Sequence, residues 1–347
     1  MWNPLRLIET LSFFAEVPLL GNVTWLQSLL GMPLPAAPIG PIAPPPPQTL
    51  LLGAATPRLQ TAQAALVAAQ QPVTLESQPP GHWVNTQRVV VDLATVTAAD
   101  LAALVAAMQR PALTVAPLLR FEGLSEAAVA SLWGAIDDGV MGGVSQSGLT
   151  LQAGLPPTAP RGYGRFAGQV STANSGGFAS VRTRNFEPPF NLQGWQGVWL
   201  WLRGDGQRYK LILRDRSGWD SVAHCASFST VAEDWQGVTV PFSALQPTFR
   251  ARTLPTADPL QVQQVCSFQL MLSKFEYNGV LNPQFQPGAF HLDVADIAVY
   301  HPAPSPQLVA IAPTPEALQP WDSALGTAQV PYQILTDPAA VVAGTGA

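Results

Sequence analysis

The middle of the chain, between Phe121 and Tyr300, consists of short segments in which apolar and polar residues alternate. Side chains alternate between the two faces of a β-strand, so this period of two predicts about eight strands. Glycine, proline, asparagine and aspartate cluster between the segments, which is the usual composition of turns. Many short strands separated by such turns are typical of a β-sandwich or a jelly roll.

The two flanks of this region have a different pattern, in which apolar strands alternate with helices. Before it, strands are predicted at Leu50–Leu52, Pro72–Leu75, Arg88–Asp92 and Ala112–Val115. After it, a helix at Glu316–Leu325 is predicted between strands at Gln307–Ile311 and Tyr332–Leu335. Alternation of strand and helix is typical of a parallel sheet. We therefore predict an α/β domain that is split by an inserted β-sandwich.

These patterns divide the chain into four parts. Residues 1–48 are an apolar amino-terminal segment with a proline-rich linker, and residues 49–120 are the first part of the split domain. The β domain covers residues 121–302, and residues 303–347 complete the split domain. Hydrophobic residues make up 47% of the chain, so a sizeable core can be buried.

The segment 1–31 is rich in leucine and aromatic residues, and its spacing predicts two short helices. These helices either pack on the protein's own domains or dock on a membrane or a membrane-embedded partner. The docking alternative assigns the contact to Trp2, Phe13, Phe14 and Trp25. Prolines between positions 33 and 41 interrupt the apolar run and exclude a membrane-spanning helix there.

Composition excludes one class of partner and restricts the compartment. Charged residues make up 11% of the chain and the net charge is −5, whereas nucleic-acid binding requires a basic surface. Cys225 and Cys266 have no Cys or His at metal-ligand spacing, so we expect two buried, reduced thiols. The amino-terminal sequence does not have the pattern of a secretory signal. We therefore expect a cytoplasmic protein that does not bind nucleic acid.

The stretch Trp133–Ser145 combines a large aromatic residue, two adjacent carboxylates and several glycines. Each glycine inside a helix costs about 1 kcal/mol relative to alanine, so this stretch is not expected to be helical. Gly142 and Gly143 stand directly before an alternating run that predicts a strand. We predict a structured turn that leads into this strand, with Trp133 and Met141 as its apolar anchors.

Asp137 and Asp138 are an adjacent pair of carboxylates, which can act as acid/base groups or as cation ligands. Adjacent side chains in an extended turn usually point apart, so we expect a structural role instead. In that role, one aspartate caps the turn or pairs with an arginine such as Arg182 or Arg203, and the other is solvated. Any functional role is expected to be contact with a partner.

The remaining candidates favour structure over chemistry. Asp205, between two glycines, is typical of a tight hairpin turn, and His224 and His291 are isolated in strand patterns. The tryptophans either pack in the core or form a binding surface for carbohydrate or protein; they are Trp195, Trp199, Trp201, Trp219 and Trp235. No Ser-His-Asp arrangement, phosphate loop or metal cluster stands out. Catalytic residues, cofactors and metals are therefore not expected.

The stretch Trp133–Ser145 resembles the opening motif of the complex I intermediate-associated protein 30 family. Further similar segments follow in order: Phe166–Val170, Gly176–Arg182, Gly197–Gly206 with Tyr209, Trp235 with Pro241–Phe242, and Phe249–Arg250. The resemblance covers residues 121–302 and implies a galactose-binding-like jelly roll. It implies as motif or partner-surface residues Trp133, Asp137, Asp138, Met141, Gly142, Gly143, Gly177, Phe178, Arg182 and Asp205.

The flanks resemble the atypical short-chain dehydrogenase fold, which carries this β domain as an insertion in the photosystem II assembly factor type. The glycine-rich turn of that fold is degenerate here: Gly53 is kept, but Thr56 and Leu59 replace the other two glycines. The predicted fold class is therefore mainly β plus α/β. A jelly-roll or galactose-binding-like β-sandwich is inserted in a split, degenerate Rossmann-like parallel sheet, and no dinucleotide cofactor is expected.

The resemblance implies a non-enzymatic assembly or stabilising factor. Its expected partners are subunits of a membrane complex of the photosystem or complex I (NADH dehydrogenase-like) kind. It is expected to bind from the cytoplasmic side, peripheral to a thylakoid or plasma membrane, with membrane contact through residues 1–31. Two alternatives stay open: an NAD(P)-binding short-chain dehydrogenase-like enzyme, and a carbohydrate-binding module.

Overall fold

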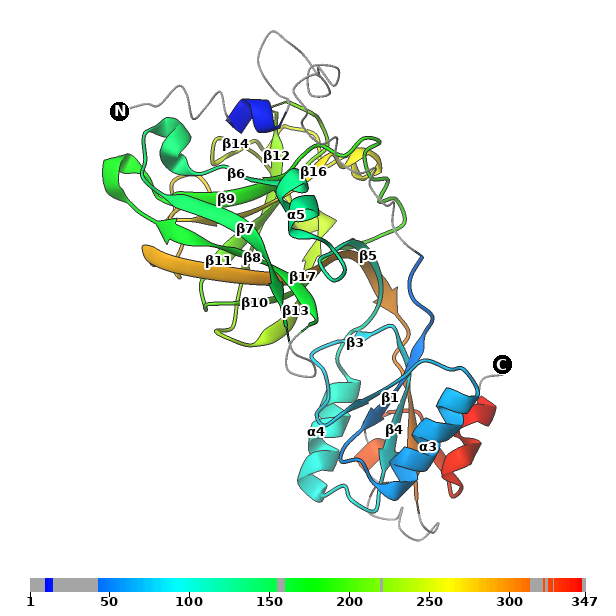
Figure 1. The fold of residues 1–347 in the computed structure, drawn as a ribbon. Helices are drawn as coiled ribbons and strands as arrows, with labels where there is room; N and C mark the ends of the chain where they lie inside the picture. Colours follow the sequence, from blue (N-terminus) through cyan, green and yellow to red (C-terminus); the bar gives the residue numbers. More distant parts are fainter. Residues whose placement is uncertain are drawn as a thin grey trace. The chain divides into compact units, whose positions relative to one another are not determined.

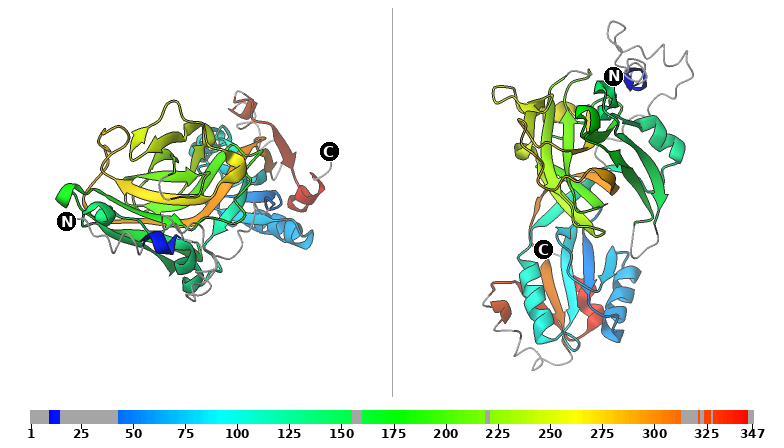
Figure 2. Two further views of the ribbon diagram at one scale, coloured as in Figure 1. Left: turned by 90° about the horizontal axis from the view of Figure 1, so that it is seen from above. Right: turned by 90° about the vertical axis from the view of Figure 1, so that its left-hand side faces the viewer.

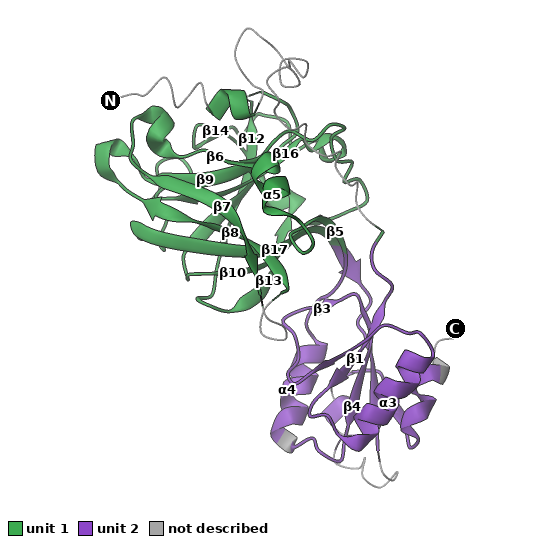
Figure 3. Ribbon diagram, viewed as in Figure 1, with its two compact units in different colours: residues 1–43, 116–300 green, residues 44–115, 301–347 purple. Residues whose placement is uncertain are grey.

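The protein is described by a computed structural model that covers residues 10–14, 43–154, 160–218, 221–312, 321, 324–326 and 328–344. The chain divides into two compact units (Figure 3): unit 1 combines residues 1–43 with 116–300, and unit 2 combines residues 44–115 with 301–347. Two boundaries lie inside the strands β5 (Ala112–Arg120) and β17 (Gly288–Ala303), so these strands contribute residues to both units.

Unit 1 is a sandwich of two β-sheets (Figure 1). In the first sheet, β13 pairs with β10 and β10 pairs with β17, all antiparallel. The initial part of β17 also pairs with β8, which pairs with β7, and β5 lies beside β17. These strands are β7 (Gln146–Ala153), β8 (Gly162–Val170), β10 (Gly197–Gly204) and β13 (Trp235–Pro241).

The second sheet of unit 1 has the strand order β15-β14-β12-β11-β16-β9-β6. Its pairs are antiparallel throughout. The strands are β6 (Trp133–Ala135), β9 (Phe178–Thr183), β11 (Arg208–Arg214), β12 (Ala223–Ser229), β14 (Gln246–Phe249), β15 (Arg252–Thr253) and β16 (Ser267–Ser273). Helix α5 (Glu126–Leu132) precedes β6 directly.

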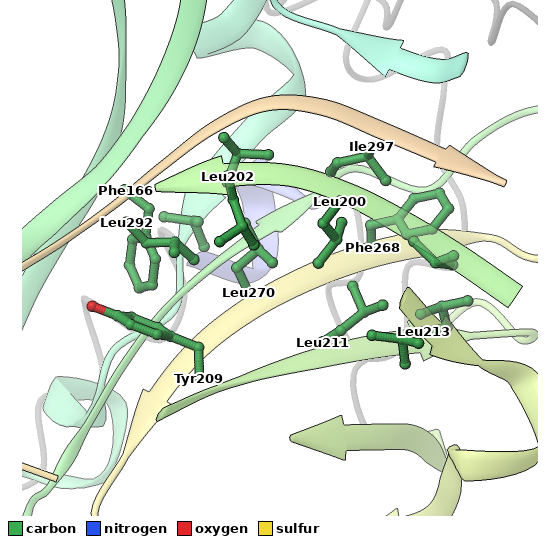
Figure 4. Close-up of a cluster of buried hydrophobic side chains, with 14 of the residues drawn as sticks. Phe166, Leu200, Leu202, Tyr209, Leu211, Leu213, Phe268, Leu270, Leu292 and Ile297 are labelled. Atoms are coloured by element: carbon green, nitrogen blue, oxygen red, sulfur yellow. The ribbon is translucent and has the colours of Figure 1, made fainter. Parts of the chain in front are cut away.

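The core of unit 1 lies between these two sheets and follows from the alternation of side chains (Figure 4). In β10, Val198, Leu200 and Leu202 are fully buried in this core, and the alternate tryptophans Trp199 and Trp201 lie on the outer face. The opposite sheet contributes Leu211, Leu213, Phe268 and Leu270. Full burial of each such side chain contributes about 1.5–3 kcal/mol, which makes this core the main stabilising feature of the unit.

Unit 2 contains a five-stranded parallel sheet with helices on both faces (Figure 2). Its strand order is β19-β18-β4-β1-β2, which is the doubly wound order 2-1-3-4-5. The strands are β1 (Gln48–Leu52), β2 (Val73–Glu76), β4 (Thr86–Asp92), β18 (Gln307–Ile311) and β19 (Tyr332–Leu335). The helices are α3 (Pro57–Ala68), α4 (Ala98–Met108) and the 3-10 helix η6 (Pro338–Gly344).

The central strands of unit 2 contain continuous apolar runs because each face of the sheet packs against a helix. Leu51 and Val90 pack with Leu59 of α3 on one face. Leu50 and Val89 pack on the other face, in the same cluster as α4 residues. The predicted fold class is confirmed: a β-sandwich is inserted in a split parallel sheet.

One predicted strand has a different position. The sequence pattern placed Ala112–Val115 in the split parallel sheet, but β5 pairs with β3 (Trp83–Val84) and continues into the first sheet of unit 1. The side chain of Asn85 bonds to both the N–H and the C=O of Val115, at 2.9 and 3.0 Å, which holds β5 beside β3. Apolar alternation identifies a strand but not its neighbour, so the sequence could not show this.

Several predictions fall on residues outside the described part of the chain. They are the second amino-terminal helix, the prolines between 33 and 41, and most of the helix predicted at Glu316–Leu325. Within the described ranges, the chain has no helix with the length and hydropathy needed to cross a membrane.

Candidate functional site

The motif turn, residues 133–145, begins where helix α5 meets β6. Ser125 caps α5 by accepting a hydrogen bond from the N–H of Ala128, at 3.2 Å. Trp133 is buried in the core of unit 1 and stacks on Phe121, with ring centroids 6.2 Å apart. The prediction that Trp133 anchors the turn is therefore confirmed. After β6, the 3-10 helix η1 (Asp138–Met141) ends at Gly142, whose φ of 96° is left-handed and suits glycine.

Asp138 is a buried carboxylate that organises the turn. Its Oδ1 accepts the N–H of Ser145 at 2.9 Å, and its Oδ2 accepts the hydroxyl of Ser145 and the N–H of Gly177, both at 2.7 Å. The N–H of Phe178 is a fourth donor, 3.3 Å from Oδ2. Hydrogen bonds to an ionised carboxylate are stronger than neutral ones, so they compensate for its removal from water.

The glycines of the motif make room for this carboxylate. A Cβ added to Gly143 would lie 2.3 Å from Cγ of Asp138, and a Cβ added to Gly176 would lie 2.5 Å from its Oδ2. Both distances are far below van der Waals contact, so a side chain at either position would force the carboxylate to move. The aspartate and the two glycines therefore form one packed unit.

Asp137 connects the turn to two other strands. Its carboxylate accepts the N–H and the hydroxyl of Ser147 at 2.7 and 2.6 Å, and the N–H of Ser180 at 3.0 Å. Ser147 belongs to β7 and Ser180 to β9, and β6, β7 and β9 lie close together (Figure 1). Burial raises the pKa of Asp137, the hydrogen bonds from Ser147 and Ser180 oppose this, and the charge of Asp138 adds to it.

A cavity of about 290 Å³ lies beside Asp137. It is lined by Thr10, Ala135, Asp137, Gly139, Val140, Gln146 and Ser147. Among these described lining residues, Asp137 is the only titratable group. Acid–base chemistry with a paired nucleophile or a second carboxylate would need another such group within reach. The cavity therefore offers a small polar recess and not a recognisable catalytic arrangement.

Two expectations about the turn are wrong. Met141 does not anchor it, since its side chain is 69% exposed and that of Val144 is 49% exposed. The side chains that are buried at the turn instead include those of Asp138 and its donor Ser145. Neither aspartate pairs with the arginines that were expected: Arg182 lies under the ring of Phe14, and Arg203 pairs with Asp293 at 2.7 Å. The expected structural role is observed, since both aspartates hold the turn by hydrogen bonds, with Asp138 fully buried and Asp137 half-buried.

The described part of the amino-terminal segment packs on unit 1. Residues 10–13 form one helical turn, and Phe14 is buried with its ring 4.5 Å from the guanidinium of Arg182. Phe13 lies 4.3 Å from the guanidinium of Arg184. The alternative of packing on the protein's own domain is therefore the one observed here, because Phe14 is not exposed for docking. Trp2 and Trp25 lie outside the described residues.

Asp205 occupies a tight turn, as predicted, but the turn is not a hairpin within one sheet. It joins β10 of the first sheet to β11 of the second. Its carboxylate accepts the N–H of Gln207 at 3.1 Å, the hydroxyl of Tyr209 at 3.0 Å and the N–H of His291 at 3.2 Å. Asp205 thus holds together strands of both sheets.

Three of the tryptophans form a stack on the outer face of the first sheet. Trp199 and Trp201 are parallel with centroids 5.9 Å apart, and Trp201 lies 6.2 Å from Trp235. Beside this stack, Arg165 and Arg203 both donate to the fully buried carboxylate of Asp293. Trp195 packs against the core, and Trp219 lies outside the described residues.

The turn between β1 and α3 ends in a helix cap. Gly53 has a φ of 118° and no atom within 4 Å of an added Cβ. Thr56 accepts the N–H of Leu59 at 3.1 Å and donates its hydroxyl to Asp92 at 2.8 Å. The Leu59 side chain is buried between α3 and the sheet. Thr56 and Leu59 thus stabilise the start of α3 after β1.

Other side chains have the structural roles expected from the sequence. Cys225 and Cys266 are buried thiols that form no disulfide. Nε2 of His224 lies 3.2 Å from the carbonyl of Asp258, and that of His291 lies 3.1 Å from a carboxylate oxygen of Glu233. No cluster of three or more potential metal ligands occurs among the described residues. The donors of the motif turn, Ser145, Ser147, Ser180 and Gly177, were not identified from the sequence as a set.

Comparison with known proteins gives one sequence relative and weak structural likenesses. An uncharacterized protein of Schizosaccharomyces pombe is 29% identical over 165 residues, covering 43% of this chain and 74% of that one. The family 11 carbohydrate-binding module of a Clostridium thermocellum cellulosomal cellulase covers 53% of this chain and 93% of its own, with 15% identity and a TM-score of 0.39. An exo-beta-agarase has a TM-score of 0.34 and 11% identity, covering 54% of this chain and 25% of its own.

A family model described as complex I intermediate-associated protein 30 matches residues 120–294, which is half of the chain. This range begins at the end of β5, includes the motif turn with both aspartates, and extends into β17. The chain belongs to the complex I intermediate-associated protein 30 family.

Proposed function

We propose that the protein is a non-enzymatic assembly or stabilising factor that binds a subunit of a membrane complex, of the NADH dehydrogenase or photosystem kind. The family name supports a role with complex I intermediates. The structural observation that carries the proposal is in the motif turn: its carboxylates are occupied by internal hydrogen bonds, whereas its apolar side chains Met141 and Val144 are exposed.

The occupied carboxylates argue against a catalytic role for the motif. An ionised carboxylate has about four lone-pair sites, and Asp138 accepts four hydrogen bonds from Ser145, Gly177 and Phe178. Asp137 accepts three. A general acid or base must reach a substrate proton, and Asp138 is buried beneath these donors.

The exposed side chains fit a protein-binding role. Aspartate hydrogen bonds fix the turn at both ends, so Met141 and Val144 are presented by a backbone that is already ordered. Binding then avoids the cost of ordering this loop, although each immobilised side chain still costs about 0.5–1.5 kcal/mol. Methionine adapts its shape to a partner surface, which is why it is frequent at binding sites.

The setting of this contact is part of the proposal. We place the protein on the cytoplasmic side of a thylakoid or plasma membrane, as a peripheral protein held by its partner complex. Because Phe14 is buried, the motif turn and not the Phe13–Phe14 pair makes the partner contact. Trp2 and Trp25 stay as candidates for additional membrane contact.

The test is capture of the partner complex by the full-length protein. Affinity-tagged wild type is incubated with detergent-solubilised membranes of the source cells, and bound subunits are identified by mass spectrometry. The Met141→Ser/Val144→Ser variant is expected to retain about a tenth or less of the captured complex, since loss of central apolar contacts costs 1–2 kcal/mol. Unchanged capture by this variant contradicts the assigned surface.

The matched control replaces two equally exposed valines elsewhere in unit 1. Val231 is 53% exposed and Val280 is 62% exposed, and neither belongs to the motif turn. The Val231→Ser/Val280→Ser variant is expected to capture the complex as wild type does. If neither wild type nor the control variant retains subunits of a respiratory or photosynthetic complex, the proposed function is wrong.

A further inference from the structure

A pair of buried arginines lies on the outer face of the second sheet of unit 1. Arg182 is in β9 and Arg184 follows the end of that strand, so the two are spaced to share a face. Gly134 of β6 is the direct cross-strand neighbour of Arg182. We call Gly134, Arg182 and Arg184 the arginine-pair site. Both guanidinium-bearing side chains are almost completely buried.

Two consecutive aromatic rings of the same chain fill this site. Phe14 lies 4.5 Å from the guanidinium of Arg182, and Phe13 lies 4.3 Å from that of Arg184. The two rings meet edge to face, with centroids 4.9 Å apart. A Cβ on Gly134 would lie 2.5 Å from the ring of Phe13, so this ring occupies the space of a missing side chain.

The present occupant leaves part of the site unsatisfied. Within the described residues, Nε and Nη1 of Arg184 are buried and donate to no acceptor. A buried donor without a partner carries a desolvation cost, and burial accordingly lowers the pKa of Arg184. The rings supply cation–π contact, but a phenylalanine ring cannot accept a directed hydrogen bond as a carboxylate does. A ligand with an acidic group next to its aromatic pair would satisfy the site better.

We propose that the arginine-pair site recognises two consecutive aromatic residues, and that Phe13–Phe14 is a displaceable occupant. A partner protein segment with an aromatic pair followed by a carboxylate replaces it. The rings would take the places of Phe13 and Phe14, and the carboxylate would accept from Arg184. This site is formed by residues other than Met141 and Val144, so it does not depend on the contact assigned above.

Displacement also has a consequence for the motif turn. Thr10, one turn before Phe14, lines the cavity beside Asp137, and its carbonyl accepts the N–H of Phe14 at 3.2 Å. Removal of the Phe13–Phe14 pair from the site therefore withdraws one wall of that cavity. A partner segment bound at the arginine-pair site would reach the motif turn from the side that Thr10 now covers.

The experiment uses full-length protein and a fluorescein-labelled synthetic peptide that contains Phe-Phe-Asp, with binding followed by fluorescence anisotropy. The Phe13→Ala/Phe14→Ala variant has no internal competitor, so it is expected to bind the peptide at least about tenfold more tightly than wild type. Adding Arg184→Met to this variant keeps the apolar stem and removes the charge. This change is expected to weaken binding about tenfold.

Two control peptides separate the chemistry of the site. Leu-Leu-Asp keeps the apolar area but removes the rings, and Phe-Phe-Asn removes the charge; each is expected to bind about tenfold more weakly than Phe-Phe-Asp. Equal binding of Leu-Leu-Asp overturns the proposal. So does the absence of saturable binding to a Phe13→Ala/Phe14→Ala variant that keeps the thermal unfolding midpoint of wild type.

A second measurement applies if that variant does not fold. Hydrogen exchange of wild type is recorded with and without saturating Phe-Phe-Asp peptide. Displacement breaks the bond from the Phe14 N–H to Thr10, so faster exchange of that amide is expected. Unchanged exchange with bound peptide overturns the proposal. The Met141→Ser/Val144→Ser variant must still bind this peptide, so failure of the proposed function and failure of the arginine-pair site give different results.

Discussion

Asp138 in the motif turn and Asp293 on the outer face of the first sheet are both fully buried carboxylates, but their charges are compensated differently. Asp138 accepts mainly from backbone N–H groups, of Ser145, Gly177 and Phe178. Asp293 accepts from two arginine side chains, Arg165 at 2.7 and 2.9 Å and Arg203 at 2.7 and 3.1 Å.

The difference concerns what each carboxylate fixes. Backbone donors can reach Asp138 only if the chain follows one path, so this aspartate determines the shape of the turn. Side-chain donors reach Asp293 from two strands whose course the sheet already sets. A buried charge that backbone donors compensate is therefore tied to conformation, whereas one that side chains compensate can be exchanged together with its partners.

The largest expected effect comes from removing the backbone-bound carboxylate. Asp138→Ala leaves several buried N–H groups without an acceptor, and each costs about 1–3 kcal/mol. We expect the free energy of unfolding, from urea titration, to fall by about 4 kcal/mol. A loss below about 1 kcal/mol would show that the turn can relax. It would contradict the claim that Asp138 determines the shape of the turn.

The second effect tests the side-chain-bound carboxylate. Asp293→Ala leaves two arginines without their partner, but these are 36% and 21% exposed, so water screens their charges. We expect a loss of about 2 kcal/mol in the same urea titration. The triple change Asp293→Leu, Arg165→Met and Arg203→Met is expected to recover most of it. If the triple change does not restore stability, Asp293 cannot be exchanged together with its partners and resembles Asp138 in this respect.

The third effect concerns the space around Asp138. Gly143→Ala introduces a Cβ 2.3 Å from the carboxylate carbon and is expected to cost about 2 kcal/mol through overpacking. Gly148→Ala is the control, because nothing lies within 4 Å of an added Cβ there. The control is expected to stay within about 0.5 kcal/mol of wild type. Equal unfolding midpoints for both variants would contradict close packing at Gly143.

The smallest effect is a pH dependence that belongs to Asp137. Burial raises its pKa above 3.8, so the folded state binds this proton more tightly than the unfolded state. The resulting stabilisation is complete below pH 3.8 and is lost as the pH rises through the raised pKa. The side chain of Asp137→Asn does not titrate. The urea midpoint of this variant minus that of wild type is therefore expected to increase between pH 3.8 and the raised pKa of Asp137. A difference between the two midpoints that does not change with pH would contradict the assignment of this pH dependence to Asp137.

The sequence predicted the elements well because strand alternation and capping are local. Because side chains alternate along a strand, Leu200 and Leu202 must lie on one face of this strand, and Trp199 and Trp201 on the other. Which face carries the tryptophans could not be predicted, since both sets of side chains are apolar. The structure places the leucines between the sheets and the tryptophans outside.

The candidate site was predicted in part for the same reason. Trp133, Asp137, Asp138 and the adjacent glycines are contiguous, so their grouping was visible. Their donors are not contiguous: Gly177 lies 39 residues from Asp138 and Ser180 lies 43 from Asp137. A single sequence carries no signal for a contact between a carboxylate and a distant backbone N–H. For this reason, arginines were expected as partners of Asp137 or Asp138, and the backbone donors were not.

The placement of β5 beside β17 has a consequence for how the protein folds. Unit 2 depends on contacts across the insertion, such as the bond of 3.1 Å from the Gln109 side chain to Ala328, which are 219 residues apart. Closing so long a loop in a disordered chain carries a large entropic cost. Once the sandwich has formed, adjacent strands of one sheet hold the start and the end of the insertion together. We therefore expect the parallel sheet of unit 2 to form more readily once the sandwich has brought the two ends of the insertion together.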